Sequence, residues 1–559
     1  MKKIALLIML AFVSYNSYSQ GYFSGDLELR SDFYVRDTAI GAANTAQYDN
    51  LKSSMDSWFS SKFRNEKWGL EVGLRMDFHV NSRLHEPTGS FTRVKLGNFF
   101  IKKKIKKLTI TGGHFYDQFG GGIAFRAYED RFLGIDNSIF GIHAKYELTK
   151  NITAKAFGGL RNDRLSTNVI GTSGAFIKGL NVEGAFSLGD NISILPGISL
   201  VNRTISQDDM STIVNNVNGY ADFNDRFIPV YNTYLIAANN TINFKRFSWY
   251  IEGAYKTKEA IKVAIGKPYQ NKAGNIIYSS LTYSTKGFGI TGQFKRTENF
   301  QFRDNPENNS SILKGTLNFI PPINKQHSLR LPSRYAPASQ EIDEIAFSID
   351  MTKKLSKKFS LTAGTSLIFD SEGMRNNFLS IKTLADGTKR LTTDANFFEL
   401  YAEFHWKASK KIKGEAGMQF LQYNKDFYEG PAGYATDALV YSPSFELTYK
   451  IDRKKSIRAE VQYQHTAKDF GQWAFALVEF SMAPNFTISV SDQWNISKGP
   501  NKSSKDNEHY YSIFTSYTQK TTRFFASYVK QVEGIVCTGG VCRLEPSFNG
   551  VKVGMNTSF

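Results

Sequence analysis

The chain ends in the stretch Val551-Lys552-Val553-Gly554-Met555-Asn556-Thr557-Ser558-Phe559, in which apolar and polar side chains alternate. Successive side chains of an extended strand point to opposite faces of the sheet. One face of this stretch therefore carries Val551, Val553, Met555, Thr557 and Phe559. A strand with lipid on one side and water or lumen side chains on the other shows this alternation. The stretch predicts a membrane-spanning β-strand.

The same alternation recurs along the whole chain. The clearest copy runs through Leu70, Val72, Leu74, Met76, Phe78 and Val80, with Glu71, Gly73, Arg75, Asp77 and His79 between them. Further copies lie at 140–148, 247–255, 345–351, 398–406, 457–463 and 486–494. A single such strand also fits a water-soluble β-sandwich, so the fold class has to be decided from the spacing of the copies.

Short and long connections alternate between these segments. The short ones are rich in lysine, as at 65–67, 102–107, 149–151, 245–246 and 353–358. The long ones include 37–53, 117–138, 204–228, 257–275, 299–343 and 371–396. Outer-membrane barrels have short periplasmic turns and longer extracellular loops. The sequence therefore predicts an all-β fold, a single large antiparallel transmembrane β-barrel of about 24 strands, within about 20 to 26.

The N-terminus carries the features of an export signal. Met1-Lys2-Lys3 precedes an apolar run from Ile4 to Val13, and Ser17-Tyr18-Ser19 supplies small residues for cleavage. This pattern predicts a secretory signal peptide over residues 1–19, removed from a barrel over 20–559. The apolar run is too short to cross a bilayer as a helix. We expect the mature protein in the outer membrane, in contact with its lipid, after insertion by the barrel assembly machinery.

The formal net charge of +18 needs a location in this fold. The lysines sit in separate short turns and form no single basic patch, so the sequence predicts no nucleic-acid partner. The turns place much of the positive charge at the periplasmic rim. This charge has two possible interpretations: contact with lipid headgroups, or simple solvation of tight turns.

A barrel of this width needs something in its lumen. The strand pattern starts at Leu27, Leu29, Phe33 and Val35, which leaves no room for an N-terminal plug domain. Wall side chains alone do not fill so wide a barrel. The lumen is therefore expected to be plugged in another way or to conduct. We expect the segment Val551–Phe559 to pair with the first strand near Leu27–Val35 and close the barrel.

The loop from Asp117 to Arg131 contains the candidate constriction of the lumen. Three glycines in a row permit a sharp bend and close backbone packing. Opposed charges across a constriction set solute selectivity. The candidate residues are Phe119, Gly120, Gly121, Gly122, Arg126, Glu129, Asp130 and Arg131. The alternative is a solvated loop whose charges pair locally.

Two further loops stand out. Cys537 and Cys542 flank a Thr-Gly-Gly-Val turn, and in an exported chain they predict a disulfide at the tip of an exposed outer hairpin. No His or third Cys lies nearby, so no metal site is expected, and no cofactor is expected either. The loop 299–343 is rich in proline and arginine. It is expected to cap the mouth or to contact an external protein partner, with plain surface decoration as the alternative.

Catalysis is not expected, and no enzyme activity is predicted. The eight histidines are scattered, and no Gly-x-Ser-x-Gly motif marks the serine-rich turns. Glu129 and Asp130 are adjacent, so in extended structure their carboxylates diverge.

Three stretches carry a family resemblance: Gln118-Phe119-Gly120-Gly121-Gly122, Tyr128-Glu129-Asp130-Arg131 and the closing Thr557-Ser558-Phe559. With the aromatic-rich strands, they make the mature chain resemble Bacteroidota-type outer-membrane β-barrels. The Phe-Gly-Gly run is similar to the turn of the porin loop that narrows the lumen. The last nine residues resemble the C-terminal insertion signal of bacterial barrels. The leading hypothesis is a plugless porin-like channel for passive diffusion of small hydrophilic solutes. The alternative is a non-conducting barrel subunit of a secretion, assembly or surface-protein complex.

Overall fold

The structure is a computed structural model. It describes residues 21–84, 89–163, 171–262, 269–306, 315–376, 378, 380–383, 389–429, 437–501, 505–538 and 541–559. The predicted signal peptide, residues 1–19, lies outside the described residues.

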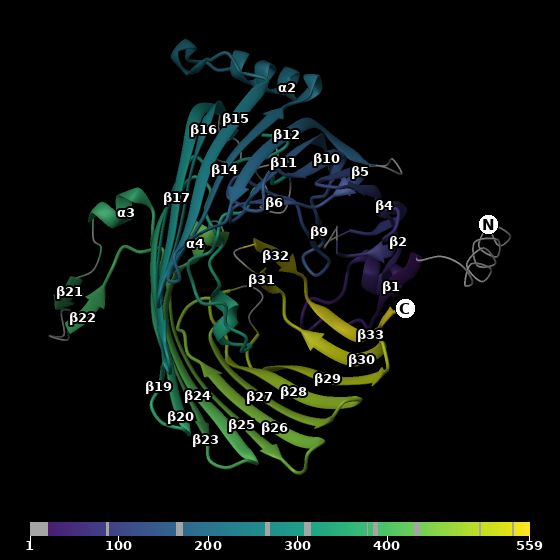
Figure 1. The fold of residues 1–559 in the computed structure, drawn as a ribbon. Coiled ribbons are helices and arrows are strands. Elements are labelled where there is room, and N and C mark those ends of the chain that lie inside the picture. The colour runs from purple at the N-terminus through teal and green to yellow at the C-terminus, as the bar shows by residue number, and fades with distance from the viewer. Residues whose placement is uncertain are drawn as a thin grey trace.

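A closed antiparallel barrel of 24 strands forms the wall of the molecule (Figure 1). The first strands are β1 (Gly21–Tyr34), β2 (Ser53–Asn65), β3 (Leu70–Ser82), β4 (Phe91–Ile105) and β5 (Leu108–Phe115). The next are β10 (Ile139–Glu147), β11 (Ile152–Asn162), β12 (Thr172–Gly184), β14 (Ile192–Thr204), β15 (Asn232–Phe244), β16 (Phe247–Lys262), β17 (Tyr269–Thr285) and β18 (Phe288–Glu298). The prediction of an all-β barrel of about 24 strands is confirmed.

The second half of the wall begins after a long connection. Its strands are β19 (Asp343–Lys354), β20 (Phe359–Phe369), β23 (Phe397–Lys407), β24 (Ile412–Asn424), β25 (Asp437–Lys450), β26 (Lys455–Gln464), β27 (Gln472–Met482), β28 (Phe486–Ser497), β29 (Glu508–Gln519), β30 (Thr522–Gln531) and β33 (Phe548–Ser558). A short strand, β13 (Phe186–Leu188), continues β12 and pairs with β14.

The first and last strands close the barrel as predicted. In the β1–β33 pair, Leu27 faces Thr557, Leu29 faces Met555 and Phe33 faces Val551. The ring of Phe559 lies with its centroid 6.1 Å from that of Phe23 and 6.4 Å from that of Phe59. The seam therefore ends in an aromatic cluster at the turn end of the barrel.

The alternation of each strand separates an apolar exterior from a polar interior. On β3, Arg75, Asp77 and His79 are buried inside, whereas Leu74 and Val80 are about two-fifths exposed outside, at 38% and 41%. Large apolar side chains are exposed in the same way on strand after strand, among them Ile142, Leu180, Leu200, Ile236, Leu281, Ile349, Leu400, Phe445, Val461, Val478, Val490 and Ile513. This exterior is the surface that a bilayer would cover.

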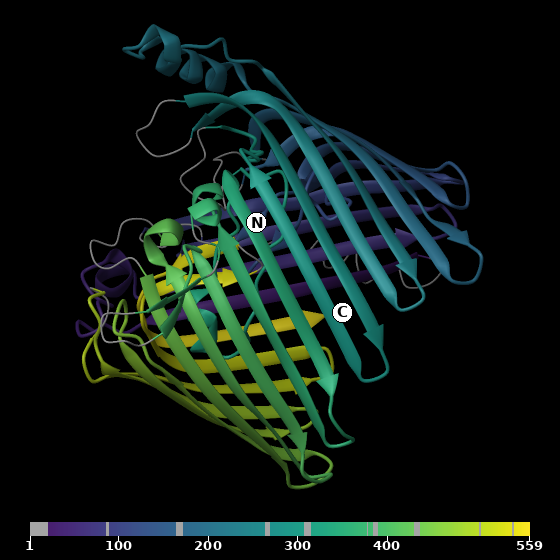
Figure 2. The same ribbon diagram turned by 90° about the vertical axis from the view of Figure 1, so that its left-hand side faces the viewer.

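Short turns gather at one end of the barrel and long loops at the other (Figure 2). The loops hold the helices: the π-helical turn η1 (Gln47–Leu51), α2 (Gln207–Asn218), the 3-10 turns η2 (Phe223–Asp225) and η3 (Pro332–Tyr335), α3 (Ser371–Asn376) and α4 (Lys425–Glu429). Helix α2 projects beyond the rim, and the hairpin of β21 (Ser380–Thr383) and β22 (Lys389–Thr392) lies outside the wall (Figure 1). No helix in the described part of the chain is long and apolar enough to span a membrane.

Two connections turn back into the barrel. We call residues 116–138 the first lumen loop; it contains β6 (Gln118–Phe119), β7 (Phe125–Arg126), β8 (Glu129–Asp130) and β9 (Ile135–Asp136). We call residues 299–306 and 315–342 the second lumen loop; it contains η3. β6 and β9 lie within the ring of wall strands in Figure 1.

The main apolar core of the molecule lies inside the barrel. It joins both lumen loops to the inner face of the wall through Phe119, Ile123, Phe125, Phe300, Phe302, Leu317, Phe157, Val201 and Leu235. These side chains are almost fully buried. The loops are therefore packed as parts of the fold, because burying this apolar surface stabilises their inward position.

Candidate functional site inside the lumen

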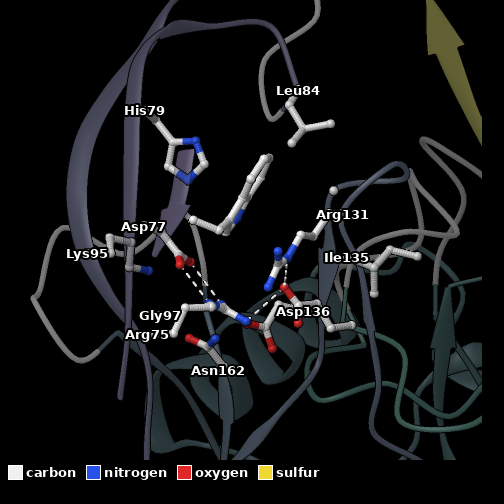
Figure 3. A pocket seen from close by; sticks show the side chains of 13 residues that line it. Arg75, Asp77, His79, Leu84, Lys95, Gly97, Arg131, Ile135, Asp136 and Asn162 are labelled. Carbon is white, nitrogen blue, oxygen red and sulfur yellow. Dashed lines mark hydrogen bonds and ion pairs between the residues drawn. The ribbon is translucent and has the colours of Figure 1, made fainter. Parts of the chain in front are cut away.

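Arg75 is the centre of a buried group of charges between the wall and the first lumen loop. From β3 its guanidinium reaches Asp77 Oδ1 at 2.7 Å, Glu129 Oε1 at 2.9 Å and Asp136 Oδ2 at 2.5 Å (Figure 3). Two of these carboxylates belong to the loop. A planar guanidinium presents five donors, so one arginine can hold several carboxylates at once. Arg75 thereby fixes both short hairpin strands, β8 and β9, to the wall.

Arg131 extends this group toward the barrel seam. Its Nε lies 2.7 Å from Glu129 Oε1, and its Nη1 lies 2.9 Å from Glu28 Oε2 on β1. Its guanidinium also lies 5.5 Å from the centroid of the Trp58 ring, within cation–π range. Glu129 thus bridges two arginines. We call Glu28, Arg75, Asp77, Glu129, Arg131 and Asp136 the charged layer.

The charged layer separates two cavities of very different size. A cavity of about 30 Å³ lies on its loop side and is lined by Trp58, His79 and Lys95 (Figure 3). A vestibule of about 890 Å³ lies on its turn side and is lined by polar wall residues such as Ser60, Lys62 and Thr111. Arg75, Glu129 and Arg131 line both. The charged layer is therefore the shared boundary of these two cavities.

Asp136 and Arg131 of the layer are charged near neutral pH. Burial raises the pKa of the Asp136 carboxyl, but the Arg75 guanidinium outweighs it and holds that pKa below its ordinary value. Burial lowers the pKa of Arg131, but Glu129 and Glu28 outweigh it and the net pKa is raised. Opposite charges at hydrogen-bond distance stabilise the ionised forms.

The glycine turn of the first lumen loop docks on the wall well away from this layer. The amide of Gly121 donates to Glu252 Oε2 on β16 at 2.9 Å, and the Tyr250 hydroxyl donates to the same oxygen at 2.5 Å. A Cβ on Gly121 would lie 2.6 Å from that oxygen, so no larger residue fits without movement. Gly120 and Gly122 have φ values of +53° and +98°, which favour glycine.

The remaining candidates in this loop are structural. Phe119 is buried against Phe125 and Phe157, with ring centroids 5.4 and 5.6 Å away. The carboxylate of Asp130 accepts the backbone N–H groups of Phe132 and Leu133 at 2.9 and 3.0 Å, which forms a local turn. Of the predicted residues, only Glu129 and Arg131 belong to the charged layer. Their predicted role in a constriction stays a prediction.

Arg126 links the two lumen loops. Its guanidinium lies between two rings, 4.4 Å from the centroid of Tyr128 and 4.3 Å from that of Phe319. Its backbone N–H donates to Leu317 O at 2.9 Å, and the N–H of Phe319 donates to Gly122 O at 2.9 Å. The loops therefore support each other through backbone bonds and a stacked cation.

The second lumen loop is anchored mainly through its backbone. Wall side chains reach its carbonyls: Lys295 Nζ lies 2.7 Å from Pro321 O, Gln464 Nε2 lies 2.9 Å from Leu331 O and Gln419 Nε2 lies 3.2 Å from Pro332 O. In return, the N–H of Leu331 donates to Gln462 Oε1 at 2.8 Å. A loop placed in a protein interior needs such partners, because unpaired backbone groups are costly there.

Ion pairs and an imidazole add to this anchoring. His327 Nε2 lies 2.6 Å from Glu399 Oε1 on β23, and Lys325 pairs with Glu403 on the same strand. At the other end of the loop, Asp304 pairs with Arg161 at 2.6 Å. The loop expected to cap the mouth or to meet an outside partner thus lies within the barrel.

The wall residues that hold the loops were not predicted as functional. They include Arg75, Lys295, Gln462 and Gln464, and the sequence pattern singles out none of them as functional. The available signal was a long charged or amide side chain at a position that the alternation assigns to the lumen. Nothing in the sequence says which loop such a side chain meets.

The hairpin of the predicted disulfide turns inward, which corrects the expected outer position. Strands β31 (Gly534–Thr538) and β32 (Val541–Glu545) lie within the barrel ring in Figure 1, and Arg543 lies 5.0 Å from the Phe132 ring of the first lumen loop. Burial lowers the pKa of Arg543 to about 10. Cys537 and Cys542 face each other in register. The predicted disulfide between them stays a prediction.

The predicted insertion signal lies on the seam strand. Val551, Val553 and Met555 face outward with Leu29 and Phe33 of β1. Its use in insertion is a prediction. In the part of the chain that the structure describes, no cluster of three or more His, Cys, Asp or Glu side chains is placed to hold a metal ion.

A family profile described as "Family of unknown function (DUF6029)" matches residues 1–559. No curated protein sequence matches the chain. Among solved structures, the siderophore receptor PirA from Pseudomonas aeruginosa is similar over 97% of this chain and 81% of its own, with 8% identity and a TM-score of 0.40. The copper transporter OprC aligns over 98% and 82%, with 7% identity and a TM-score of 0.40. The translocation pore of the P pilus usher PapC aligns over 96% and 99%, with 9% identity and a TM-score of 0.42. Likenesses this weak carry no argument about function.

Proposed function

The chain belongs to the DUF6029 family of unknown function, and we propose that it is an outer-membrane channel for small hydrophilic solutes. In this proposal, two loops folded into the lumen narrow the path, and the charged layer forms its gate along the β1–β5 wall. The function is passive diffusion, and no catalytic step is part of it.

A bilayer location is supported by the outer surface of the barrel. Large apolar side chains are exposed all around the wall, for example Ile142 at 64% and Val478 at 56%. Soluble proteins rarely expose a continuous apolar surface of this extent. The predicted export signal and the closing strand support the outer membrane as the site.

The observation that carries the channel proposal is the pairing of Glu129 with both Arg75 and Arg131 between two cavities. A polar vestibule of about 890 Å³ opens on one side of this pairing. Rings and layers of opposed charge set the selectivity of narrow pores.

Planar-bilayer recording of the purified full-length barrel tests the proposal. The wild-type protein should conduct, and Glu129→Gln/Arg131→Gln should change its conductance and its cation-to-anion selectivity. Asp130→Asn is the matched control, because the Asp130 carboxylate accepts two backbone N–H groups in a local turn and lies outside the charged layer. A folded barrel that never conducts, or variants that all share wild-type selectivity, would overturn the proposal.

A non-conducting barrel subunit of a surface or secretion complex is the second candidate. Its supporting observation is the buried anchoring of the second lumen loop on β18, β23, β24 and β26. A loop held in this way can serve as a permanent plug. Absence of conductance, together with co-purification of stoichiometric partners, would favour this candidate.

A further inference from the structure

The second lumen loop carries two arginines that lack the carboxylate partners found elsewhere in the lumen. Arg330 precedes the 3-10 turn η3, and Arg334 lies within it, four residues further along the chain. Within the described residues, neither guanidinium forms an ion pair; Arg330 has one hydrogen bond, from Nε to Gln493 Oε1 at 3.1 Å. Arg75, Arg131 and Arg161, in contrast, pair with carboxylates. This difference marks the η3 region as a place where two guanidinium groups lack a carboxylate partner.

Arg334 is held in place by aromatic rings and keeps donors free. Its guanidinium carbon lies 4.1 Å from the centroid of Trp473 and 5.0 Å from that of Phe470. Its Nη1 is buried and has no hydrogen-bond partner in the described part of the chain. Burial lowers the pKa of Arg334 to about 10, so the group still carries its charge near neutral pH. A stacked, charged guanidinium with an unused N–H edge is preorganised to receive an anion.

Two wall residues add unused donors beside these arginines. Gln493 on β28 and Tyr510 on β29 face each other in register, and both are at least 95% buried. Gln493 Nε2 and Tyr510 Oη are buried and lack hydrogen-bond partners among the described residues. The Tyr510 ring lies 5.5 Å from the Trp473 ring, on which Arg334 also stacks. Directly opposed residues of neighbouring strands have Cβ atoms about 5 Å apart, so both side chains start from the same level of the inner wall.

The neighbouring carboxylates are already engaged. The charge of Asp469 raises the pKa of Arg334 against the effect of burial. Asp469 itself lies 3.0 Å from Lys425 Nζ and accepts a hydrogen bond from Asn501 Nδ2 at 2.7 Å. Glu508, beside Tyr510, lies 2.5 Å from Lys530 Nζ. Lys425 also pairs with Glu429, and Lys530 also pairs with Asp37, so the charges around η3 balance and the feature left for a ligand is the set of unused donors. Buried donors without acceptors are costly, and an anion or ordered water would relieve that cost.

We infer that Arg330, Arg334, Gln493 and Tyr510 form a binding site for an oxyanion, the carboxylate or phosphate group of a small solute in the lumen. The site lies between η3 and the β28–β29 wall. Arg330 is exposed within the lumen, which gives a solute access to the buried donors behind it. Two guanidinium groups match the paired oxygens of a carboxylate or phosphate. The inference concerns binding and does not require that the barrel conducts.

Calorimetric titration of the full-length barrel, folded in neutral detergent at low ionic strength, tests the site. Inorganic phosphate and acetate are titrated separately, so that the two oxyanion classes are distinguished. At least one should bind, and Arg330→Gln and Arg334→Gln should each weaken it by about tenfold or more, since charge-assisted bonds to both are lost. Tyr510→Phe removes one hydroxyl with little effect on packing and should weaken binding by a factor of about three to ten.

Arg226→Gln is the matched control, because Arg226 lies in the outer loop after α2 and stacks on Phe223. It should leave binding unchanged. Heat-dependent gel migration confirms that each variant is folded. The inference is wrong if neither anion gives heat up to about 10 mM, or if the lumen variants bind as tightly as Arg226→Gln. Binding of only one of the two anions supports it and identifies the class.

Discussion

The first lumen loop is tied to the wall through its side chains, whereas the second is tied mainly through its backbone. In the first, Arg75 and Glu28 of the wall grip Glu129, Arg131 and Asp136. In the second, wall amides and a lysine grip the carbonyls of Pro321, Leu331 and Pro332. Charge therefore holds the loop beside the vestibule, whereas neutral hydrogen bonds from glutamines hold the second loop at Leu331 and Pro332. Charge pairs respond to pH, salt and charge substitution. The first loop is therefore suited to act as a gate, and the second to fill the lumen without moving.

The largest effect is expected from Arg75→Ala. It leaves Asp77 and Asp136 buried without their guanidinium, and breaking a buried pair in this way costs about 3–5 kcal/mol. We expect a lower melting temperature of the detergent-folded barrel and faster proteolysis within residues 129–136. Arg523→Ala is the control, because Arg523 makes only a 3.5 Å hydrogen bond to Ser516. Equal melting temperatures for the two variants would contradict the central position of Arg75.

A smaller effect, confined to the second loop, is expected from Gln462→Leu/Gln464→Leu. The pair removes one donor and one acceptor from Leu331, and each unsatisfied buried group costs about 1–3 kcal/mol. Hydrogen–deuterium exchange should rise in residues 329–335 and stay unchanged in residues 129–136. The exposed turn variant Gln519→Leu should change neither. Equal acceleration in both loops would show that they do not have separate anchors.

The parts of the molecule tested in these two experiments were not equally predictable from the sequence. The wall was predictable, because a period of two, repeated with alternating short and long connections, has few other solutions. The inward position of the first loop could also be predicted, from Phe119 to Gly122 and the charged residues that follow them. The anchors of the second loop were not predictable. Every residue has a backbone carbonyl, so the sequence does not show which carbonyls are bonded. Gln464 bonds Leu331 O across 133 positions of sequence, and only the closed barrel brings them together.

The inward hairpin of β31 and β32 shows the same limit. Its sequence fits an exposed tip and an inward tip equally well. The deciding contact, Arg543 on Phe132, joins two loops that are distant in the chain. A strand pattern predicts which way a wall side chain points, and it carries no information on which way a connection folds.

Gly121→Ala should disturb only the glycine turn. The new Cβ would lie 2.6 Å from Glu252 Oε2 and 2.8 Å from the Tyr250 hydroxyl, and relieving such overpacking costs about 1–3 kcal/mol. The midpoint of urea unfolding should fall. Gly253→Ala on the same wall strand is the control, since its Cβ would meet nothing closer than 3.9 Å. If the two variants unfold at the same urea concentration, the turn does not dock on β16 as described.

The smallest effect is expected from acid, and it should separate the loops. The pKa of Asp136 is lowered by Arg75 against the effect of burial, and that of Asp117 is lowered by His143 and Lys155, again against burial. Carboxyls with a depressed folded-state pKa contribute stability that is complete above their ordinary pKa of about 3.9 and is lost as the pH falls further. Exchange in residues 129–136 should therefore rise below about pH 4, after correction for intrinsic rates. Residues 329–335, held by glutamines, should change less, and the reverse order would contradict the comparison.

The position of the second lumen loop against the inner wall is tested most directly by chemical cross-linking. Cys537 and Cys542 are first replaced by Ser, and His327→Cys is combined with Glu399→Cys, because these side chains lie 2.6 Å apart inside the barrel. A short bismaleimide should join the two cysteines in the folded protein, as read by mass spectrometry. The control pair places the second cysteine at Leu400, which faces outward beside Glu399. Efficient cross-linking of the first pair alone is the predicted result. Equal or absent cross-linking in both pairs would contradict a loop anchored in the lumen.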